Sequence, residues 1–449
     1  MSYRHSRCRW LAAIAPVAAV ILVLAPLRTI VAQAPPLDSL IARALEVDPR
    51  VQAARARHRA MEARVGPAAA LPDPMLMVGV QNLAVGERWF ADFMTMKMVG
   101  LSQTLPARGS LASARRAAES DARATRLGVD EVSRAVERDV RSAYYDVWYA
   151  DAALALVERT REVLVAMISA TEARYAVGTA GQSDLLRARV EVAKLGEEAV
   201  RLHEDRGAAV ARLNSYLDRA PGTPLVRADL PPRIRRAAVA DSDSAIRFVS
   251  PSLGSRAADS PLPALQTLQA RAVEESPALR AGEARVAAQT ARAELARLAR
   301  RPDINLSLQY GQRDGFSDMV SAVVSLPLQV RRARNQDQSL VAEQADLAAV
   351  GADLHGERAM LLAEVARLHA ELERARSALG LLVKAVIPQS AAALDAALSN
   401  YQAGRTEFTT VLDAQATLFN SQASHLLQLN EFAKRLAELQ QVVGTEILP

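Results

Sequence analysis

Cysteine and aromatic residues are scarce in this chain of 449 residues. The one cysteine, Cys8, precedes the first apolar stretch, so it lacks the context of a lipid-anchored cysteine and cannot form an intramolecular disulfide. Aromatic residues make up only 4% of the chain, and the few glycines and prolines cluster at a few places. This composition is unlike that of a large β-sandwich or an α/β enzyme and favours long, uninterrupted helices.

Motifs that carry enzymatic or metal chemistry are also missing. The six histidines are scattered without the HExxH spacing of a zinc site: His5, His58, His203, His355, His369 and His425. The sequence contains no phosphate-binding loop, no nucleophile elbow and no paired-cysteine motif. We therefore expect no enzyme activity, no cofactor and no metal site.

The excess of positive charge belongs to the N-terminus. Residues 1–32 contain four arginines and no acidic residue, so removing them from the 55 basic residues leaves 51 against 50 acidic ones. The remaining charges alternate in sign, as on solvated helix faces, so no nucleic-acid partner is expected.

The same N-terminal residues have the features of a secretory signal. A basic start is followed by an apolar stretch over 11–27 and by Ala32-Gln33-Ala34, a cleavage-site pattern. We predict a signal peptide over 1–32, with an uncleaved anchor as the alternative because the apolar stretch is long. No later segment is predicted to be apolar enough for a membrane helix.

The rest of the chain is a duplication. Residues 42–57 resemble 270–285, residues 71–80 resemble 301–310, and residues 174–188 resemble 400–414, in the same order and at nearly the same offset. The sequence therefore predicts two copies of one unit, 37–230 and 264–449. A linker or equatorial segment rich in Pro, Ser and Asp joins them over 231–263.

Each unit predicts the same series of elements. A helix over 36–70 or 264–300 precedes two strands, over 73–83 and 93–105 or over 302–312 and 318–328. A long helix over 107–177 or 329–403, a glycine-containing turn and a shorter helix complete the unit. Apolar residues recur every three or four positions along the long helix, which predicts coiled-coil packing. Such a helix is about 105 Å long and would lie beside two short helices stacked end to end.

The four strands have the length and alternation of membrane β-strands. Ile304, Leu306 and Leu308 lie on one face of the third strand and polar residues on the other. Trp89, Phe90 and Phe93 follow the first strand, where an aromatic girdle is expected. Four strands cannot close a barrel, and lipid does not tolerate open sheet edges, so three copies with twelve strands are the simplest solution.

This pattern resembles the TolC-like outer-membrane efflux family. The resemblance covers nearly all of the chain after residue 32 and rests on the duplication, on ALPDPMLMVG and GLSQTLPARG around the first hairpin, and on the helix reversals RYAVGTAGQSDLLRARVEV and NYQAGRTEFTTVLDAQATL. It implies a mostly α fold with a membrane β-barrel: a homotrimer with a 12-stranded barrel in outer-membrane lipid and a periplasmic α-helical tunnel. Such a channel is passive and docks onto a periplasmic adaptor and an inner-membrane pump, here expected to be of the RND type.

The resemblance also implies roles for residues at the helix reversals. Tyr175 and Gly178 match Tyr401 and Gly404, at the tips where the adaptor docks. The periplasmic constriction of the family carries two carboxylates in the second reversal. Asp413 matches one, Thr410 stands in place of the other, and Asp184 is the counterpart of Thr410 in the first copy. Solvated carboxylates at a helix start are the alternative interpretation.

The LPDP motif and the methionines of the first hairpin resemble the heavy-metal branch of the family. Thioethers suit Cu(I), but Met94, Met96 and Met98 lie opposite Lys97, on what we take to be the lipid face, so packing against lipid is the favoured interpretation. The predicted function is export, with heavy-metal cations as the favoured cargo and drug efflux or type I protein secretion as alternatives. A periplasmic adaptor or a coiled-coil scaffold is the alternative from another class.

Two further features carry predictions. The aromatic cluster of Tyr144, Tyr145, Trp148 and Tyr149 is expected to be core, with an equatorial belt of extra contacts as the alternative. Pro388 interrupts the second long helix, where the first copy has Glu162, and predicts a kink in one copy only.

Overall fold

The computed structural model describes residues 36–83, 92–178, 181–225, 227–239 and 262–448, all within one unit of the chain. The predicted signal peptide, Trp89, Phe90 and most of the linker lie outside the described residues. Boundaries of the two copies and of the linker therefore remain predictions.

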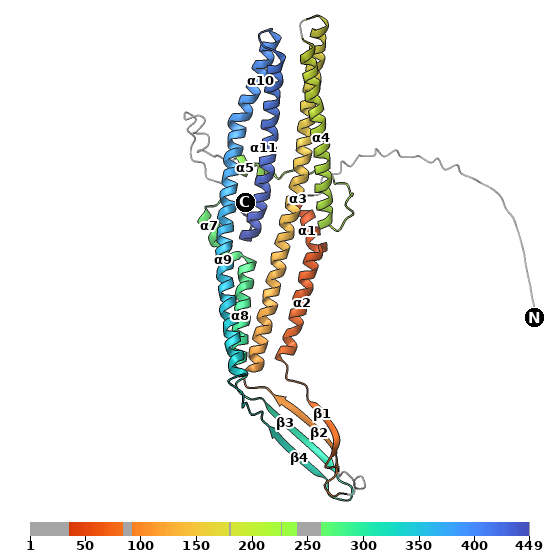
Figure 1. Ribbon diagram of the computed structural model, residues 1–449, viewed down its shortest axis with the longest axis vertical. Helices are drawn as coiled ribbons and strands as arrows, with labels where there is room; N and C mark the ends of the chain where they lie inside the picture. The colour runs from red at the N-terminus through yellow and green to blue at the C-terminus, as the bar shows by residue number, and fades with distance from the viewer. Residues whose placement is uncertain (1–35, 84–91, 179–180, 226, 240–261, 449) are drawn as a thin grey trace, which may run out of the picture. The chain divides into compact units, whose positions relative to one another are not determined.

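The same order of elements occurs twice along the chain (Figure 1). The first series is α1 (Leu37–Val47), α2 (Pro49–Ala69), β1 (Met75–Gln81), β2 (Met96–Leu105), α3 (Ser110–Ala176) and α4 (Gln182–Tyr216). The second is α7 (Leu265–Glu275), α8 (Pro277–Leu298), β3 (Ile304–Gln312), β4 (Met319–Ser325), α9 (Gln336–Leu381), the π-helical turn η1 (Leu382–Val386), α10 (Ile387–Gln402) and α11 (Phe408–Val443). A short helix, α5 (Pro232–Val239), lies between them. The predicted mostly α fold with a small sheet is confirmed.

The first helix of each series is broken, contrary to the prediction of single helices over 36–70 and 264–300. Asp48 and Ser276 cap the second piece, and each is followed by a proline at the first helical position. Proline cannot donate the backbone hydrogen bond that a continuing helix needs, and it holds the preceding residue in an extended conformation. The Asp-Pro and Ser-Pro pairs therefore mark helix starts. The prediction missed them because the apolar pattern continues across both pairs.

The second long helix contains a π-helical turn where the first has none. At the end of η1, the N–H of Ile387 donates to the carbonyl of Leu382, five residues back. Pro388 follows directly, and its ring would clash with the carbonyl four residues before it in an α-helix. Widening the preceding turn avoids this clash, so the helix continues through the proline.

One expectation about hydropathy was wrong. The helix Gln336–Gln402 is long and apolar enough to cross a membrane by length and composition alone, with a mean hydropathy of 1.5 in its apolar window. Only 22% of that window is buried. Packing against α8 and α11 therefore covers only part of this apolar surface.

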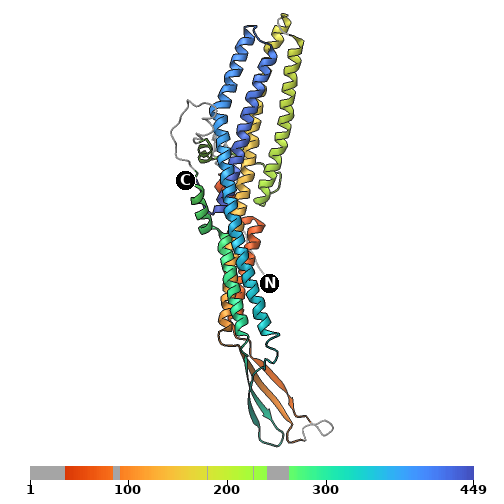
Figure 2. The ribbon, with the colours of Figure 1, turned by 60° about the vertical axis from the view of Figure 1, so that its left-hand side comes forward.

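The core follows the apolar stripe of the long helices. Val136, Val140 and Val147 of α3 are fully buried, as are Leu368 and Leu372 of α9. Burying each such side chain contributes about 1.5–3 kcal/mol, so this stripe is the main stabilising element of the helical part. Figure 2 shows the long helices running beside the shorter ones.

The aromatic cluster belongs to this core, as predicted. Tyr144, Tyr145 and Trp148 are buried, and Tyr149 is partly buried against the same core. The Tyr144 hydroxyl accepts a hydrogen bond from the backbone N–H of Asp229 at 3.0 Å. The cluster therefore also attaches the segment that follows α4 to the middle of α3.

The strands form one antiparallel sheet in the order β1-β2-β3-β4. The two hairpins meet between β2 and β3, where Leu101 lies opposite Leu308 and Ser102 opposite Ser307. Each of the outer strands, β1 and β4, pairs on one side only within the described residues.

Candidate functional site

The sheet has two chemically different faces. Residues directly opposite each other share a face, so the register assigns every side chain. One face is apolar and carries Leu76, Val78, Val99, Leu101, Leu306, Leu308, Tyr310, Val320 and Val324. The other carries Ser102, Asn305, Ser307, Gln309, Ser321 and Ser325. Most of the apolar face is exposed to solvent in the isolated chain, as expected for strands that contact lipid.

The register corrects the position predicted for the methionines. Met98 lies opposite Gly311, and Met77 lies opposite Gly100, which in turn lies opposite Gln309. Met75, Met77, Met96 and Met98 therefore share the polar face and not the apolar one. Lys97 is on the apolar face, close to the hairpin turn, where it forms an ion pair with Asp314 at 3.4 Å. The prediction that Met96 and Met98 lie on the apolar face was wrong, because a single lysine near a strand end does not identify the polar face; Met94 precedes β2 and stays a prediction.

Aromatic side chains connect the turns of the two hairpins. The rings of Phe93 and Phe316 meet edge to face, with centroids 6.3 Å apart, and the guanidinium of Arg313 lies over Phe316. Of the three predicted girdle residues only Phe93 lies within the described residues. Phe316, which the sequence analysis missed, follows β3 as Phe93 precedes β2.

The two helix reversals are built alike but differ in their contacts. Gly178 and Gly404 each have positive φ, +75° and +70°, a conformation that glycine adopts without strain. Tyr175 is exposed, whereas Tyr401 stacks against Phe408 with ring centroids 5.2 Å apart. The second tip is therefore the more tightly packed of the two.

One arginine connects the tips. Arg174, near the end of α3, donates to the backbone carbonyl of Tyr401 at 3.2 Å and lies over its ring at 4.5 Å. The two helix hairpins thus touch at their ends through a cation and an aromatic ring.

The predicted constriction residues lie at the starts of the two final helices. Asp413 and Thr410 are both exposed in the first turns of α11, and Asp184 is half-buried in the first turn of α4. Among the described residues, no hydrogen bond or ion pair joins these three to one another.

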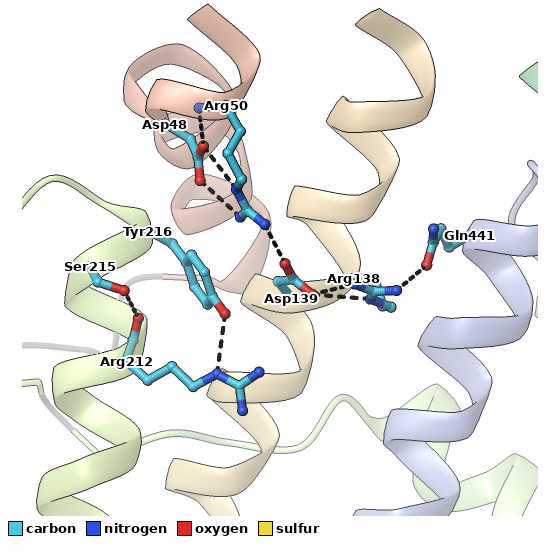
Figure 3. A network of polar contacts seen from close by, with 8 residues as sticks. All are labelled: Asp48, Arg50, Arg138, Asp139, Arg212, Ser215, Tyr216 and Gln441. Atoms are coloured by element: carbon cyan, nitrogen blue, oxygen red, sulfur yellow. Dashed lines mark hydrogen bonds and ion pairs between the residues drawn. The ribbon is translucent and has the colours of Figure 1, made fainter. Parts of the chain in front are cut away.

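A network of charged residues lies where α1 ends and α2 begins (Figure 3). Asp48 accepts hydrogen bonds from the backbone and side chain of Arg50, and Arg50 donates to Asp139 of α3 at 2.7 Å. Arg138 donates hydrogen bonds to the carboxylate of Asp139 and to the side-chain oxygen of Gln441 of α11, the second at 2.7 Å. The network therefore joins the first and second halves of the chain.

Its central carboxylate is ionised at neutral pH. Burial alone would raise the pKa of Asp139, but hydrogen bonds from Arg50 and Arg138 outweigh burial and hold that pKa below its ordinary value. Sequence analysis missed this network, although the Asp-Pro-Arg start of α2 is a visible signal for its first half.

Comparison with known proteins gives a family and a fold. The family model described as outer membrane efflux protein matches residues 40–219 and 268–445. Among solved structures, the outer-membrane channel OprN has a TM-score of 0.74 at 18% identity, covering 92% of this chain and 91% of that one. CusC has a TM-score of 0.74 at 17% identity, covering 91% and 92%.

A third solved structure is the open state of the MtrE outer membrane channel of Neisseria gonorrhoeae, with a TM-score of 0.72 at 19% identity, covering 92% and 90%. Among curated proteins, none matches this sequence. At these identities the structural matches show the fold, and the family model, which matches most of the chain, shows the family. The chain therefore belongs to the TolC-like outer membrane efflux protein family and is located in the outer membrane, with its helices extending into the periplasm.

Proposed function

We propose that this chain is one subunit of a homotrimeric channel, a passive conduit for export across the periplasm and the outer membrane. One observation carries the proposal: the sheet has an exposed apolar face and two open edges, β1 and β4. In lipid, unpaired backbone groups at such edges cost several kcal/mol each, so the sheet must close on other copies. Three copies supply twelve strands, enough for a barrel with an open interior.

The helical part supports the same arrangement. The apolar window of Gln336–Gln402 is mostly unburied within one chain, and lipid is not its expected neighbour, because charged residues flank it along the same helix. Another copy of the chain would cover it, as helix bundles require. The homotrimer thus explains two exposed apolar surfaces at once.

Export through such a channel requires partners that supply energy. We propose a tripartite system with a periplasmic adaptor and an inner-membrane pump of the RND type. The adaptor would dock at the helix reversals, around Tyr175, Gly178, Tyr401 and Gly404. The exposed Tyr175 ring and the two left-handed glycines support this role, since Tyr175, Gly178 and Gly404 are all exposed.

Asp413, Thr410 and Asp184 are proposed to surround the constriction of the tunnel. Asp413 is exposed on α11, so three copies would place three carboxylates around the threefold axis. The ring would favour cations over anions. An Asp413→Asn variant should show reduced cation selectivity in planar-bilayer recordings, and unchanged selectivity would remove Asp413 from the constriction.

The proposed channel performs no chemistry of its own. Heavy-metal cations are the favoured cargo because of the methionine content of the hairpins, with drugs and type I secreted proteins as the alternatives. The resistance of a deletion strain to copper, silver, zinc, cobalt and cadmium, compared with its resistance to dyes and antibiotics, distinguishes metal cargo from organic cargo. Sensitivity to organic compounds alone would contradict the metal cargo.

Closure between copies can be tested directly with engineered cysteines, since the only native one is Cys8. Val78→Cys on β1 is combined in turn with Val320→Cys, Ala322→Cys or Val324→Cys on β4, all on the apolar face. At least one pair should give a covalent trimer on non-reducing gels of the outer-membrane fraction. Each single-cysteine variant is the matched control and should give none. Absence of heat-modifiable trimers from this fraction would contradict the proposal.

A further inference from the structure

Half of the chain's methionines lie on one face of the sheet. Met75 and Met77 of β1, Met96 and Met98 of β2 and Met319 of β4 are five of the ten methionines in the sequence. We call these five residues the thioether ladder. They share their face with serine, asparagine and glutamine, and this is unusual because thioethers normally fill apolar gaps.

Burial along β2 and β3 indicates that this face is the concave one. Over residues 96–102 of β2 and throughout β3 the residues of this face are less exposed than their neighbours on the apolar face, and Gly100, Ser102 and Gly311 are buried. A closed barrel has its concave face inside. In the proposed channel, the ladder therefore lines the interior, in contact with water and with whatever passes.

Glycines make room for the sulfur atoms. Across the sheet, one row reads Gly79, Met98, Gly311 and Met319. A β-carbon on Gly311 would lie 2.6 Å from the Met96 sulfur, so this thioether rests on the glycine between the two methionines of the row. The sulfur of Met96 thus lies over a glycine in a row that also carries Met98 and Met319.

The ladder runs along the barrel wall. Met75 lies opposite Ser102 at the end of the sheet nearest the helices, and Met96 lies opposite Gln81 near the hairpin turn. Six residues of β2 separate these two levels, about 20 Å at 3.4 Å per residue. The ladder thus spans most of the apolar band of an outer-membrane barrel, which is about 25 Å tall.

Thioethers select a narrow class of ligand. They are neutral, soft donors that do not titrate, and they bind Cu(I) in preference to the hard cations that choose oxygen. Carboxylates or histidines grouped for a harder metal do not occur among the described residues. Several weak sites in succession also suit conduction, because an ion must bind well enough to enter and loosely enough to leave.

We propose that the thioether ladder binds soft monovalent metal ions, Cu(I) or Ag(I), as cargo in transit through the barrel. The inference rests on the proposed channel function and adds a site and a substrate class to it. The ions are coordinated by thioether sulfur without change of oxidation state, and they pass from one level of the ladder to the next.

The first test needs no variant. Purified full-length wild-type channel is treated with hydrogen peroxide, with and without Ag(I), and methionine sulfoxide is quantified by peptide mass spectrometry. The ladder methionines should be oxidised without silver, because water reaches them, and protected when silver is bound. Met167 and Met360, on helices, are internal controls that silver should not protect. Unoxidised ladder methionines, or oxidation that silver does not change, would overturn the proposal.

The second test uses matched variants. Met77→Leu, Met96→Leu and Met98→Leu together remove the soft donors but keep similar side-chain volumes. The control carries Met61→Leu, Met167→Leu and Met360→Leu. Loss of outer-shell partners alone weakens metal sites by about 10–100-fold, so loss of ligands should weaken Ag(I) binding by at least about tenfold, in the ladder variant only. Equal Ag(I) affinity in the two variants, or none in the wild type, would overturn the proposal.

Failure of the metal site and failure of the channel are distinguishable. Heat-modifiable trimers and ion conductance in planar bilayers report on the channel, whereas silver resistance reports on the ladder. If the ladder variant retains trimers and conductance but loses silver resistance, the proposal stands. If wild-type trimers conduct ions without binding silver, only the ladder proposal fails. If the triple variant does not form trimers, Met98→Leu alone replaces it and is judged by the same loss of silver binding.

Discussion

The two halves of the chain have the same architecture but differ at three levels along the rod. In the middle, α3 is continuous over 67 residues, whereas the equivalent helix of the same length contains η1 before Pro388. At the tips, Tyr175 is exposed and Tyr401 is stacked. At the break between the short helices, Asp48 belongs to an ionic network, whereas the Ser276 hydroxyl caps α8 by accepting a hydrogen bond from the N–H of Leu279. The two copies thus keep the same backbone order while their helix continuity, tip packing and helix caps differ. At these three places we expect the two halves to differ in stability or in motion.

The largest effect is expected from moving the proline to the other half. Glu162→Pro should destabilise the channel by about 3 kcal/mol, because α3 has no widened turn to receive the ring and loses a helical hydrogen bond. Thermal unfolding followed by helical circular dichroism measures this loss of stability. Glu162→Ala is the control and should change the midpoint little, since Glu162 is exposed.

The reverse change tests whether the π-helical turn has a function. Pro388→Ala should restore regular α-helix and leave stability unchanged or slightly higher. If η1 lets its hairpin move during opening, pump-dependent resistance should fall although trimers form normally. Unchanged resistance would show that the turn only accommodates the proline.

Breaking the charged network where α1 ends and α2 begins should have the next largest effect on stability. Asp139→Ala leaves Arg50 and Arg138 without their shared carboxylate and should cost about 2 kcal/mol, less than a fully buried pair because both arginines remain partly exposed. The folded pKa of Asp139 is depressed, so its stabilisation is complete above about pH 4 and is lost as the pH falls through that lower value. Thermal melts between pH 7 and 3 should show a steeper acid loss in the wild type than in Asp139→Asn. Parallel curves would contradict this assignment.

The tips should respond unequally to the same substitution. Tyr401→Ala removes a ring packed against Phe408 and Arg174 and should cost about 1.5 kcal/mol. Tyr175→Ala should stay within about 0.5 kcal/mol, as expected for an exposed position. Hydrogen exchange at the tips measures the difference, and equal protection in both variants would show that the stacking is not a stabilising contact.

The smallest effect on stability is expected where α7 ends and α8 begins. Ser276→Ala removes the cap of α8 and should cost about 0.5 kcal/mol, because its hydrogen bond to the N–H of Leu279 is long, at 3.5 Å. Asp48→Ala removes a cap together with a partner of Arg50 and should cost more. Thermal melts of both variants compare the junctions, and a larger loss for Ser276→Ala would reverse their ranking.

Much of this fold was predictable from local patterns. The order of elements, the four strands, the glycine reversals and the apolar stripe of α3 and α9 all follow from periodicity and from residues with special backbone preferences. The breaks at Asp48 and Ser276 were visible as Asp-Pro and Ser-Pro pairs but were missed, because the apolar pattern continues across them. The Arg50–Asp139 pair could not be predicted, since 89 residues separate its members.

By itself, the sequence determined that the chain is a duplicated helical unit with two β-hairpins, because helix and strand periods and turn residues act within a few positions of each other. Only the tertiary structure decided which face of the sheet the methionines occupy. That face depends on the register between β2 and β3, and the two strands lie some two hundred positions apart in the chain. A shift of one residue in register would move every side chain of a strand to the opposite face, so the nature of the channel wall is a property of strand pairing and not of local sequence.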